Sequence, residues 1–442
     1  LYIKGERMNN KERDEKFLKS WLKKKISITT STVVSFLITG AIGGGAAYGA
    51  GNKAGTGGNN NSVAWGQGSS VDNDSVAVGA NARAVSASGG VPAVTSKGVA
   101  IGNNAKAEGS ISIGELSSSN HFGVAVGYKA GAQNTTTGSS FSNVTIGANT
   151  RVGVQGTQAA QGIAIGSGVQ AHEGAWAKGD QSISIGANTI ASGDSSIAIG
   201  GDDLLSVSTK TSSYSDAKFD KNGNKIGGNS NNTASINNIF NTLTGRGAIL
   251  HQGTGTDGKF YTAWRNTESG QGAVALGVKS ISGDIALAIG TFSEATGTNS
   301  VAIGTGAQTP QSGAVAIGGG STTYGLQGRQ ITDADIALTD GTTMSLTNFA
   351  GASGVLEGSM VSFGKIGNER QLKNIAPGAV SATSTDGING SQLFAVAKKL
   401  GDDISKFKYV SIKSNDAGNK LNDGATANNA IAIGPNASTK VE

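Results

Sequence analysis

The sequence predicts an all-β solenoid, in which short strands stack into a continuous roll, and three observations lead to that fold class. The chain of 442 residues contains 70 glycines and only 5% aromatic residues, so it lacks the large apolar side chains that fill a globular core. Apolar residues make up 37% of the chain and recur in short ordered runs, which disfavours disorder. A motif of the form Val/Ile-Ala-Val/Ile-Gly recurs at short intervals, as expected for stacked layers of small residues.

The motif is predicted to form one short strand of each repeat. Val or Ile alternates with Ala or Ser, and this period of two is that of a strand with two different faces. The glycine that ends the motif fits a turn that needs a positive φ or a close backbone approach. The glycines that end successive motifs are Gly66, Gly79, Gly102, Gly114, Gly127, Gly147, Gly166, Gly186, Gly200, Gly277, Gly290, Gly304, Gly318 and Gly434.

Where nothing is inserted, successive motif glycines are 12 to 14 residues apart. This period is too short for a helical repeat and suits two short strands joined by two turns. A coil of this length encloses only small or β-branched side chains, so the second apolar face of the motif strand needs another partner. Association of identical chains about a shared axis supplies that partner. The coils are expected to stack about 4.8 Å apart, with two open ends that need caps.

Residues 1–50 are predicted to be an extended signal peptide, with Met8 as the true start. A basic region at 11–25 precedes an apolar stretch at 26–42, and small residues follow, with cleavage expected within 47–50. The alternative is a permanent transmembrane anchor. This segment carries the whole formal charge of +5, because the rest of the chain is neutral overall. The pI of about 9.1 therefore does not indicate nucleic-acid binding.

No catalytic, cofactor-binding or metal site is predicted. The chain has no Cys, which excludes thiol catalysis, Cys-zinc sites and disulfides, and its 3 histidines lack the spacing of metal ligands. The acidic pairs at 202–203 and 333–335 lack the Gly-rich nonapeptide of calcium solenoids, and no glycine run has the Lys-Ser/Thr of a phosphate loop. A Ser-His-Asp arrangement assembled from distant residues stays open. We therefore predict a protein that is not an enzyme.

Residues 203–270 interrupt the repeat and concentrate aromatic residues that are scarce elsewhere. Two interpretations are open. The segment either presents a receptor-binding surface, since aromatic and Arg residues dominate interface hot spots, or uses its aromatics to pack a small core and dock on the roll. The receptor-binding candidates are Tyr214, Phe219, Phe260, Tyr261, Trp264 and Arg265.

The repeat over residues 62–320 resembles the YadA-like head of trimeric autotransporter adhesins, which are passengers of type V secretion. A more specific likeness lies at 360–393, where the segments Met360–Gly364, Gly367–Gly378 and Thr385–Leu393 resemble the family's neck. At the neck, three chains exchange places below the head and pass into a stalk. The resemblance implies a left-handed parallel β-roll homotrimer with a neck and a short trimeric coiled coil. Pro377 and Gly387 depart mildly from the commoner neck pattern.

A coiled-coil stalk is predicted to follow the neck. Apolar residues after residue 392 are spaced 4-3-4-3, the seam of a coiled coil, over only two heptads. The candidate residues of neck and stalk are Glu369, Arg370, Asp386, Asn389, Gln392, Leu393, Leu400, Ile404 and Phe407.

The expected domain order follows from these segments. It is signal peptide 1–50, head repeats 51–202, insertion 203–270, head repeats 271–320, connector 321–359, neck 360–393, stalk 394–408 and the start of a second head 409–442. The resemblance implies outer-membrane anchoring by a C-terminal β-barrel, which this sequence does not contain. Since the sequence stops inside a repeat, we expect it to be part of a longer chain.

The resemblance also implies a function. The chain is expected to be exported and displayed at the cell surface of a Gram-negative bacterium as a virulence-associated adhesin. Its expected partners are the other chains of a homotrimer and a host protein such as collagen, fibronectin, laminin or a CEACAM-type receptor, bound multivalently. The first alternative is a self-associating protein of biofilms. A polysaccharide-active β-solenoid enzyme is less favoured, because it needs a longer coil with clustered acids or Arg along a groove.

Overall fold

The computed structural model describes residues 62–72, 74–85, 97–132, 142–154, 161–170, 173–247, 266–339 and 341–405, with 425, 427, 430–434 and 436–439. The chain divides into two compact units, Leu1–Gly328 with Leu356–Arg370 and Arg329–Val355 with Gln371–Glu442, and each is described by itself. The predicted signal peptide lies outside the described residues. Within the described ranges, no helix has both the length and the apolar character needed to span a membrane.

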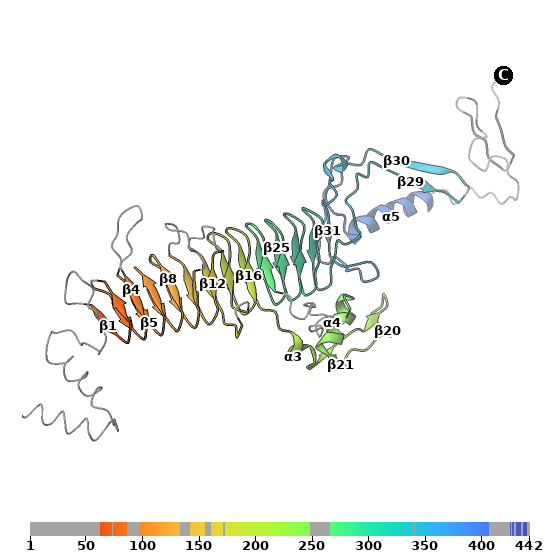
Figure 1. The fold of residues 1–442 in the computed structure, drawn as a ribbon. Helices are drawn as coiled ribbons and strands as arrows, with labels where there is room; N and C mark the ends of the chain where they lie inside the picture. The colour runs from red at the N-terminus through yellow and green to blue at the C-terminus, as the bar shows by residue number, and fades with distance from the viewer. Residues whose placement is uncertain are drawn as a thin grey trace, which may run out of the picture. The chain divides into compact units, whose positions relative to one another are not determined.

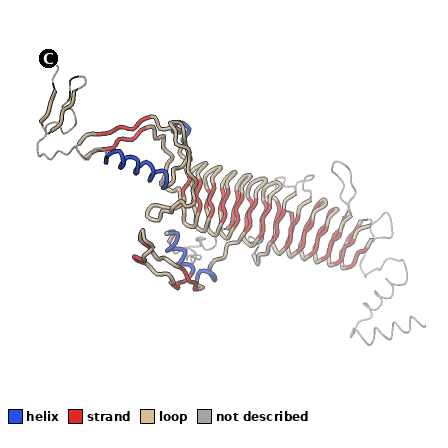
Figure 2. The backbone as a smooth tube through the Cα atoms, turned by 180° about the vertical axis from the view of Figure 1, so that it is seen from behind, coloured by secondary structure: helices blue, strands red, loops and turns tan. Residues whose placement is uncertain are grey.

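The first unit is a roll of two parallel sheets, in which strands from the two sheets alternate along the chain (Figures 1 and 2). We call the larger one the motif sheet. In spatial order its strands are β1 (Val63–Trp65), β3 (Val76–Val78), β5 (Val99–Ile101), β7 (Ile111–Ile113), β9 (Val124–Val126), β11 (Val144–Ile146), β13 (Ile163–Ile165), β15 (Ile183–Ile185), β17 (Ile197–Ile199), β23 (Val274–Leu276), β25 (Leu287–Ile289), β27 (Val301–Ile303), β28 (Val315–Ile317) and β31 (Val361–Ser362).

The smaller one is the return sheet, which closes each coil. Its strands in spatial order are β2 (Ser70–Val71), β4 (Arg83–Val85), β6 (Lys106–Glu108), β8 (Ser118–Asn120), β10 (Gly131–Ala132), β12 (Arg151–Val152), β14 (Trp176–Ala177), β16 (Thr189–Ala191), β22 (Thr267–Ser269), β24 (Ile281–Ser282) and β26 (Glu294–Ala295). The predicted all-β parallel roll is confirmed. Because the strands pair in register, equivalent residues of successive coils lie one above another, as in the pairing of Ala288 with Ala302.

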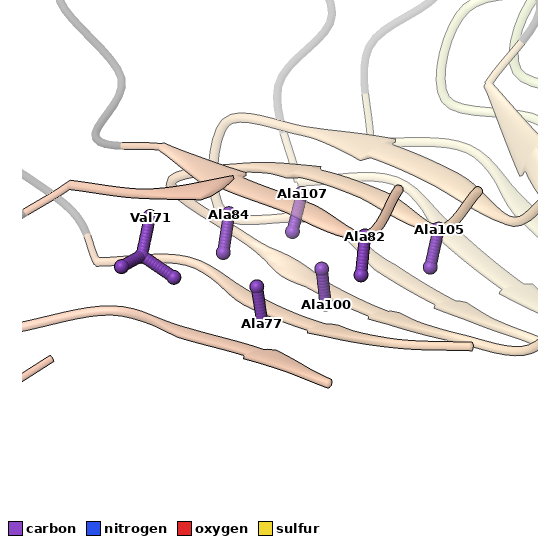
Figure 3. Close-up of a cluster of buried hydrophobic side chains, with 7 residues drawn as sticks. All are labelled: Val71, Ala77, Ala82, Ala84, Ala100, Ala105 and Ala107. Carbon is purple, nitrogen blue, oxygen red and sulfur yellow. The ribbon is translucent and has the colours of Figure 1, made fainter. Parts of the chain in front are cut away.

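The interior of the roll is filled mainly by Ala, Ser and Thr, with Val71 and Val152 on the return sheet. Figure 3 shows one such cluster, in which Ala77 and Ala100 of the motif sheet face Ala84 and Ala107 of the return sheet. Buried hydroxyls pair with one another, as Ser112 Oγ and Ser117 Oγ do at 2.7 Å. The sequence pattern did not determine which face of the motif strand points inward. The Ala/Ser face does, so Val and Ile point outward.

Each motif glycine forms the corner between the two sheets. Gly290 has a φ of 126°, and a Cβ built on it would lie 2.7 Å from the carbonyl carbon of Gly304 in the next coil. A side chain is therefore excluded both by the backbone conformation and by the close stacking of coils. Two positions after the glycine, the chain again adopts a left-handed conformation, at Asn81, Asn104 and Phe292 with φ of 53°, 55° and 60°.

A small subdomain leaves the roll after β17 and is part of the same unit. It consists of α3 (Leu205–Ser208), β18 (Thr211–Tyr214), β19 (Lys218–Phe219), β20 (Lys225–Gly227), β21 (Asn232–Ser235) and α4 (Ile236–Thr244), with β18 antiparallel to β21 and β19 antiparallel to β20. Helix α4 starts at an N-cap whose hydroxyl, Ser235 Oγ, accepts a hydrogen bond from Asn238 N at 3.3 Å. It ends at Gly245, whose φ of 65° gives a left-handed cap.

The second unit contains an antiparallel hairpin of β29 (Asp333–Ala337) and β30 (Thr343–Thr347), a 3-10 turn at Ala352–Gly354, and helix α5 (Gly390–Ser405). No residue of α5 is buried. Two surface ion pairs span one turn of this helix, Lys398 with Asp402 and Lys399 with Asp403. Near the end of the described chain, Ala425 and Thr439 form a parallel bridge.

Candidate functional site

The candidate sites of this protein are surfaces. Within the described part of the chain, no group of three or more His, Cys, Asp or Glu is arranged to hold a metal ion. The candidate surfaces are the outer faces of the two sheets, the subdomain that leaves the roll, and the segment at the end of the roll.

The outer face of the motif sheet is a continuous apolar ladder. The two outward positions of each strand carry mainly Val, Ile or Leu, and they remain partly exposed in the single chain along its whole length. Examples from one end to the other are Ile111 at 42%, Ile146 at 41%, Leu276 at 41% and Ile317 at 39% exposure. Fourteen strands at a spacing of about 4.8 Å extend this ladder over about 60 Å. Soluble monomers rarely expose an apolar surface of this extent, so the ladder is a candidate assembly surface.

The outer face of the return sheet is polar. Because its strands are in register, one outward position of each strand forms a straight column, which we call the outer column. Its members are Ser70, Arg83, Lys106, Ser118, Gly131, Arg151, Trp176, Ile190, Glu268, Ile281 and Glu294. The outer column thus carries mostly charged or small residues, with Trp176, Ile190 and Ile281 among them, whereas the ladder on the motif sheet is mainly apolar.

The subdomain is inserted at a single corner of one coil. Thr267, the first residue of β22, pairs with Thr189, the first residue of β16, and Asn188 Nδ2 donates to Asp202 Oδ2 at 2.8 Å. Residues 188–189 of one coil therefore correspond to Asp202 and Thr267 of the next. Without residues 203–266, Gly200 and Gly277 would be 13 positions apart, which is the spacing of Gly277 and Gly290.

The root of the insertion is buried. Asp202 is 6% exposed, and Lys279, at the equivalent corner of the following coil, is fully buried. Burial raises the pKa of the Asp202 carboxyl, although the hydrogen bond from Asn188 and the charge of Lys279 oppose this shift. The insertion therefore leaves the roll at a corner whose charged side chains are buried.

The insertion docks back on the roll through an aromatic contact. Phe240 of α4 lies edge-on to Phe292, with ring centroids 5.9 Å apart, and Leu204 completes the buried cluster. Phe292 occupies the left-handed corner position with a φ of 60°, which is unusual for a bulky residue. At the corner of a later coil, Gly320 leaves room for α4, since a Cβ there would lie 2.5 Å from Thr244 Cα.

A half-buried ion pair reinforces this contact. The Arg246 guanidinium donates to Phe292 O and to Glu294 Oε2, both at 2.9 Å, and its Cζ lies 4.8 Å from the centre of the Phe292 ring. Gln308 Nε2 donates to the same Glu294 oxygen at 2.6 Å. The side chains of Arg246 and Glu294 are 13% and 14% exposed, so this pair is screened less than a surface pair. The insertion is therefore held by a specific interface.

The sequence-predicted receptor-binding residues are only partly within the described chain. Tyr214 lies half-buried on β18, and Phe219 lies on β19 with 59% of its surface exposed. The two residues belong to different two-stranded sheets. The other four candidates, Phe260, Tyr261, Trp264 and Arg265, lie outside the described residues.

The exposed hairpins around Phe219 are braced by two carboxylates. Asp216 Oδ1 accepts from Asn229 N at 2.6 Å and from Asn232 Nδ2 at 2.7 Å, and the hydrogen bond from the Asn229 backbone lowers the pKa of Asp216. Asp220 Oδ1 accepts from Asn224 N at 2.8 Å, which likewise lowers the pKa of Asp220. These bonds give the hairpins defined shapes although they bury little apolar surface.

Sequence reasoning missed Phe292, Arg246 and Glu294. One signal was present: the position two residues after a motif glycine is Asn or Gly in most coils, and Phe292 breaks that pattern. No local signal marks Arg246 as its partner, because the two residues are 46 positions apart.

Two of the predicted neck residues lie at the end of the roll. Arg370 donates to Ser321 Oγ at 2.7 Å, to Gly319 O at 2.6 Å and to Phe363 O. Two of these acceptors are carbonyl groups at the last coil, since β31 is the final strand of the motif sheet among the residues that the structure describes. Glu369 Oε1 accepts from Gly367 N at 2.8 Å, and this bond lowers the pKa of Glu369.

Three further neck residues form a clasp in the second unit. Gln392 Nε2 donates to Gly378 O at 2.6 Å, while Gln392 Oε1 accepts from Gly378 N at 3.0 Å. Asn389 Nδ2 donates to Ile375 O at 3.1 Å, and Asp386 Oδ2 accepts from Ala379 N at 2.9 Å. The clasp fixes the extended segment 375–379 against the start of α5.

The predicted stalk residues within α5 are exposed in the single chain. Leu393, Leu400 and Ile404 expose 66%, 60% and 62% of their surface. Phe394 and Val396, which the seam prediction does not include, are also exposed. Phe407 lies outside the described residues. An apolar helix stripe with no buried residue is typical of a helix that packs against partners.

Comparison with known proteins gives the family of the repeat. The YadA head domain repeat matches residues 177–202, 282–307, 295–321 and 425–440. Among solved structures, the C-terminal YadA-like domain of a Burkholderia pseudomallei protein is 24% identical, covering 45% of this chain and 72% of that chain with a TM-score of 0.21. No curated protein sequence matches the chain. The resemblance predicted from the sequence is confirmed by the repeat family.

Proposed function

We propose that this chain, a YadA-like protein of the trimeric autotransporter adhesin type, forms the adhesive head of a homotrimer displayed at the bacterial surface. The observation that carries the proposal is the apolar ladder on the motif sheet. Its Val and Ile side chains remain partly exposed on a roll whose interior is already filled, mainly by Ala and Ser. Three ladders facing a common axis would bury this surface and leave the return sheets outward.

Helix α5 supports the same assembly. None of its residues is buried within the chain, and the exposed Leu393, Leu400 and Ile404 have coiled-coil spacing. A helix of 16 residues is marginal on its own in water, so association with identical helices would stabilise it. We therefore propose a trimeric stalk that begins at the Asn389–Gln392 clasp.

The exposed parts of the head fit recognition better than catalysis. A trimer would present three copies of the return sheet and of the docked insertion, so weak single contacts gain through multivalency. On the insertion, Phe219 and Ile226 expose 59% and 67% of their surface on braced hairpins. We propose that this insertion contributes to binding of a host receptor or matrix protein. The proposed setting is a secreted chain anchored at the outer membrane.

Deletion of residues 203–266 is the sharpest test, because it joins Asp202 to Thr267 and restores a coil of ordinary length. Purified wild-type and deleted proteins are compared for binding to host cells, collagen, fibronectin and laminin. The oligomeric state of each protein is measured by light scattering. We expect both to be trimers, and we expect the deletion to reduce binding at least about tenfold through loss of three contacts per trimer.

Three results would contradict the proposal in whole or in part. A wild-type protein that is monomeric at micromolar concentration would remove the assembly on which it rests. A trimer that aggregates with itself but binds no cell or matrix surface would favour the alternative function in self-association. Retained binding by the deleted trimer would move the receptor site from the insertion to the roll.

A further inference from the structure

The outer column of the return sheet is polarised in charge. From β4 to β12 it carries Arg83, Lys106 and Arg151, whereas from β22 to β26 it carries Glu268 and Glu294. Small residues, Ser118 and Gly131, separate the basic members. The basic part of the column runs parallel to the stacking direction, so cations recur along a straight line at multiples of the strand spacing of about 4.8 Å.

The acidic end of the column is already occupied within the chain. Glu268 Oε1 accepts from Ser192 Oγ at 2.5 Å. Glu294 accepts from Arg246 and Gln308, which brings the docked insertion over this end. Neither carboxylate is therefore free for an external partner.

At the basic end, Arg83 forms an exposed ion pair with Glu108 of β6 at 3.9 Å, but the cations further along the sheet differ. Arg151 Cζ and Lys178 Nζ lie 4.0 Å and 4.3 Å from the centre of the Trp176 ring, and Trp176 Nε1 is fixed by a hydrogen bond to Gly153 O at 2.8 Å. Arg151 Nε is buried without a hydrogen-bond partner, and burial lowers the pKa of Arg151. No ion pair joins Lys106, Arg151 or Lys178 to a carboxylate among the residues that the structure describes. Two cations held beside one ring without a carboxylate partner repel each other and attract an anion.

We propose that the return sheet between β4 and β14 binds a linear sulfated polysaccharide, laid along the outer column and centred on Arg151, Trp176 and Lys178. The ligand class follows from the shape of the site. The cations form a line on a flat sheet, and the aromatic ring beside them is already in contact with both. An acidic protein would instead need a pocket for a buried anchor residue, as protein interfaces generally have. A linear polyanion needs only a row of cations and hydrogen-bond donors such as Ser118.

This inference rests on the proposed adhesive function, because only a trimer with its motif sheets inward leaves the return sheets open. It deepens that function by naming a ligand class for the roll itself, separate from the inserted subdomain. An experiment can therefore contradict the polysaccharide site on the return sheet without contradicting the adhesive function.

The test measures binding of the purified full chain to immobilised heparin and dextran sulfate over a salt gradient. Sodium polyglutamate and neutral dextran are the comparison ligands. The variant Arg151→Gln/Lys178→Gln is expected to bind heparin about a hundredfold more weakly, since each of its two lost charge-assisted contacts to an anion contributes on the order of a tenfold factor. The matched control is Lys129→Gln/Lys218→Gln, with Lys218 exposed on β19. It also removes two positive charges, and Lys129 likewise lies over a ring, that of Tyr128 at 5.0 Å, but off the outer column. We expect this control to bind like the wild type.

Folding is monitored by thermal melting and light scattering. If Arg151→Gln impairs folding, Lys106→Gln/Lys178→Gln replaces it, because Lys106 is exposed and its loss leaves Arg151 on Trp176. An equal loss in the matched control would overturn the inference, because the effect would then follow net charge alone. Equal affinity for polyglutamate and heparin would point to an acidic protein instead. A trimer that binds cells but not heparin or dextran sulfate at low salt would overturn this inference and leave the proposed function standing.

Discussion

The motif sheet and the return sheet line the same interior but carry different side chains on their outer faces. In both sheets the inward residue is mainly Ala, Ser or Thr, as Ala288 and Ala295 illustrate. On the motif sheet the outward neighbours are mainly Val, Ile or Leu, whereas the outer column of the return sheet combines Arg, Lys and Glu with small residues, Trp176 and two isoleucines, Ile190 and Ile281. Since the interior is common, the outer faces must account for the different roles of the two sheets.

This difference shows how a narrow roll can use its two outer faces for different functions. An interior of small side chains buries too little apolar area to stabilise a long chain by itself. The outer face of the motif sheet is therefore available for assembly. The outer face of the return sheet is available for binding external ligands or for docking an inserted subdomain. The insertion fits this division, because it contacts Phe292 and Glu294 at the corner and outer column of the return sheet.

The largest expected effect comes from one substitution made on opposite faces of the same coil. Ile289→Asp on the motif sheet places a carboxylate at the proposed trimer axis, and Ile281→Asp places it on the return sheet, with both residues half-buried in the single chain. A buried unpaired charge costs about 4 kcal/mol, so we expect Ile289→Asp to weaken association roughly a thousandfold. Sedimentation equilibrium measures the change, and circular dichroism checks that the roll remains folded. A trimer unaffected by Ile289→Asp, or disrupted equally by Ile281→Asp, would remove the distinction between the sheets.

The second expected effect is loss of docking on the return-sheet side. Phe240→Ala removes a side chain that is 4% exposed and packs on Phe292, at a cost of about 3 kcal/mol to docking. Phe219→Ala is the matched control, because Phe219 is exposed on β19. Hydrogen exchange followed by mass spectrometry should show faster exchange in α4 for Phe240→Ala only, with exchange in the roll unchanged. Unchanged protection of α4 would mean that the Phe240 contact is not what holds the insertion.

The repeating part of the fold was predictable because its determinants are local. The alternation of Val or Ile with Ala, followed by glycine, lies within five residues and encodes a strand with two different faces and the corner after it. The pattern alone left open which face is internal. The stacked structure settles that question, because a coil closed by Gly290 at such close spacing has room inside for Ala288 but not for Ile289.

The candidate sites were less predictable because they depend on long-range contacts. Arg151 and Trp176 are 25 positions apart in sequence, with the motif strand β13 between them, yet they are direct partners on neighbouring strands of the return sheet. Phe292 and Arg246 meet only because α4 folds over later coils. The Gln392 clasp could be identified as a neck from its likeness to the family, but its bonds to Gly378 could not be inferred from spacing.

A smaller effect is expected from enlarging the shared interior. Ala302→Leu on the motif sheet and Ala295→Leu on the return sheet each overpack a fully buried site, at about 2 kcal/mol per substitution. Thermal melting at one fixed protein concentration should show similar losses for both, and the exposed Thr298→Leu should show little change. If only the motif-sheet variant were destabilised, the interior would not be common to the two sheets.

The smallest expected effect is a pH dependence confined to the hairpins of the insertion. The backbone hydrogen bond from Asn229 holds the pKa of Asp216 below its ordinary value of 3.8. A carboxyl group with a lowered pKa in the folded state stabilises the fold above its ordinary pKa, and this contribution declines as the pH falls through the lower folded-state value. We therefore expect the peptide containing Asn229 to lose exchange protection below pH 3.8, relative to intrinsic rates, while β25 stays protected because it has no such carboxylate. Asp216→Asn should produce the same loss at neutral pH. Protection of the hairpin that is unchanged down to pH 2 would show that the carboxylate does not brace it.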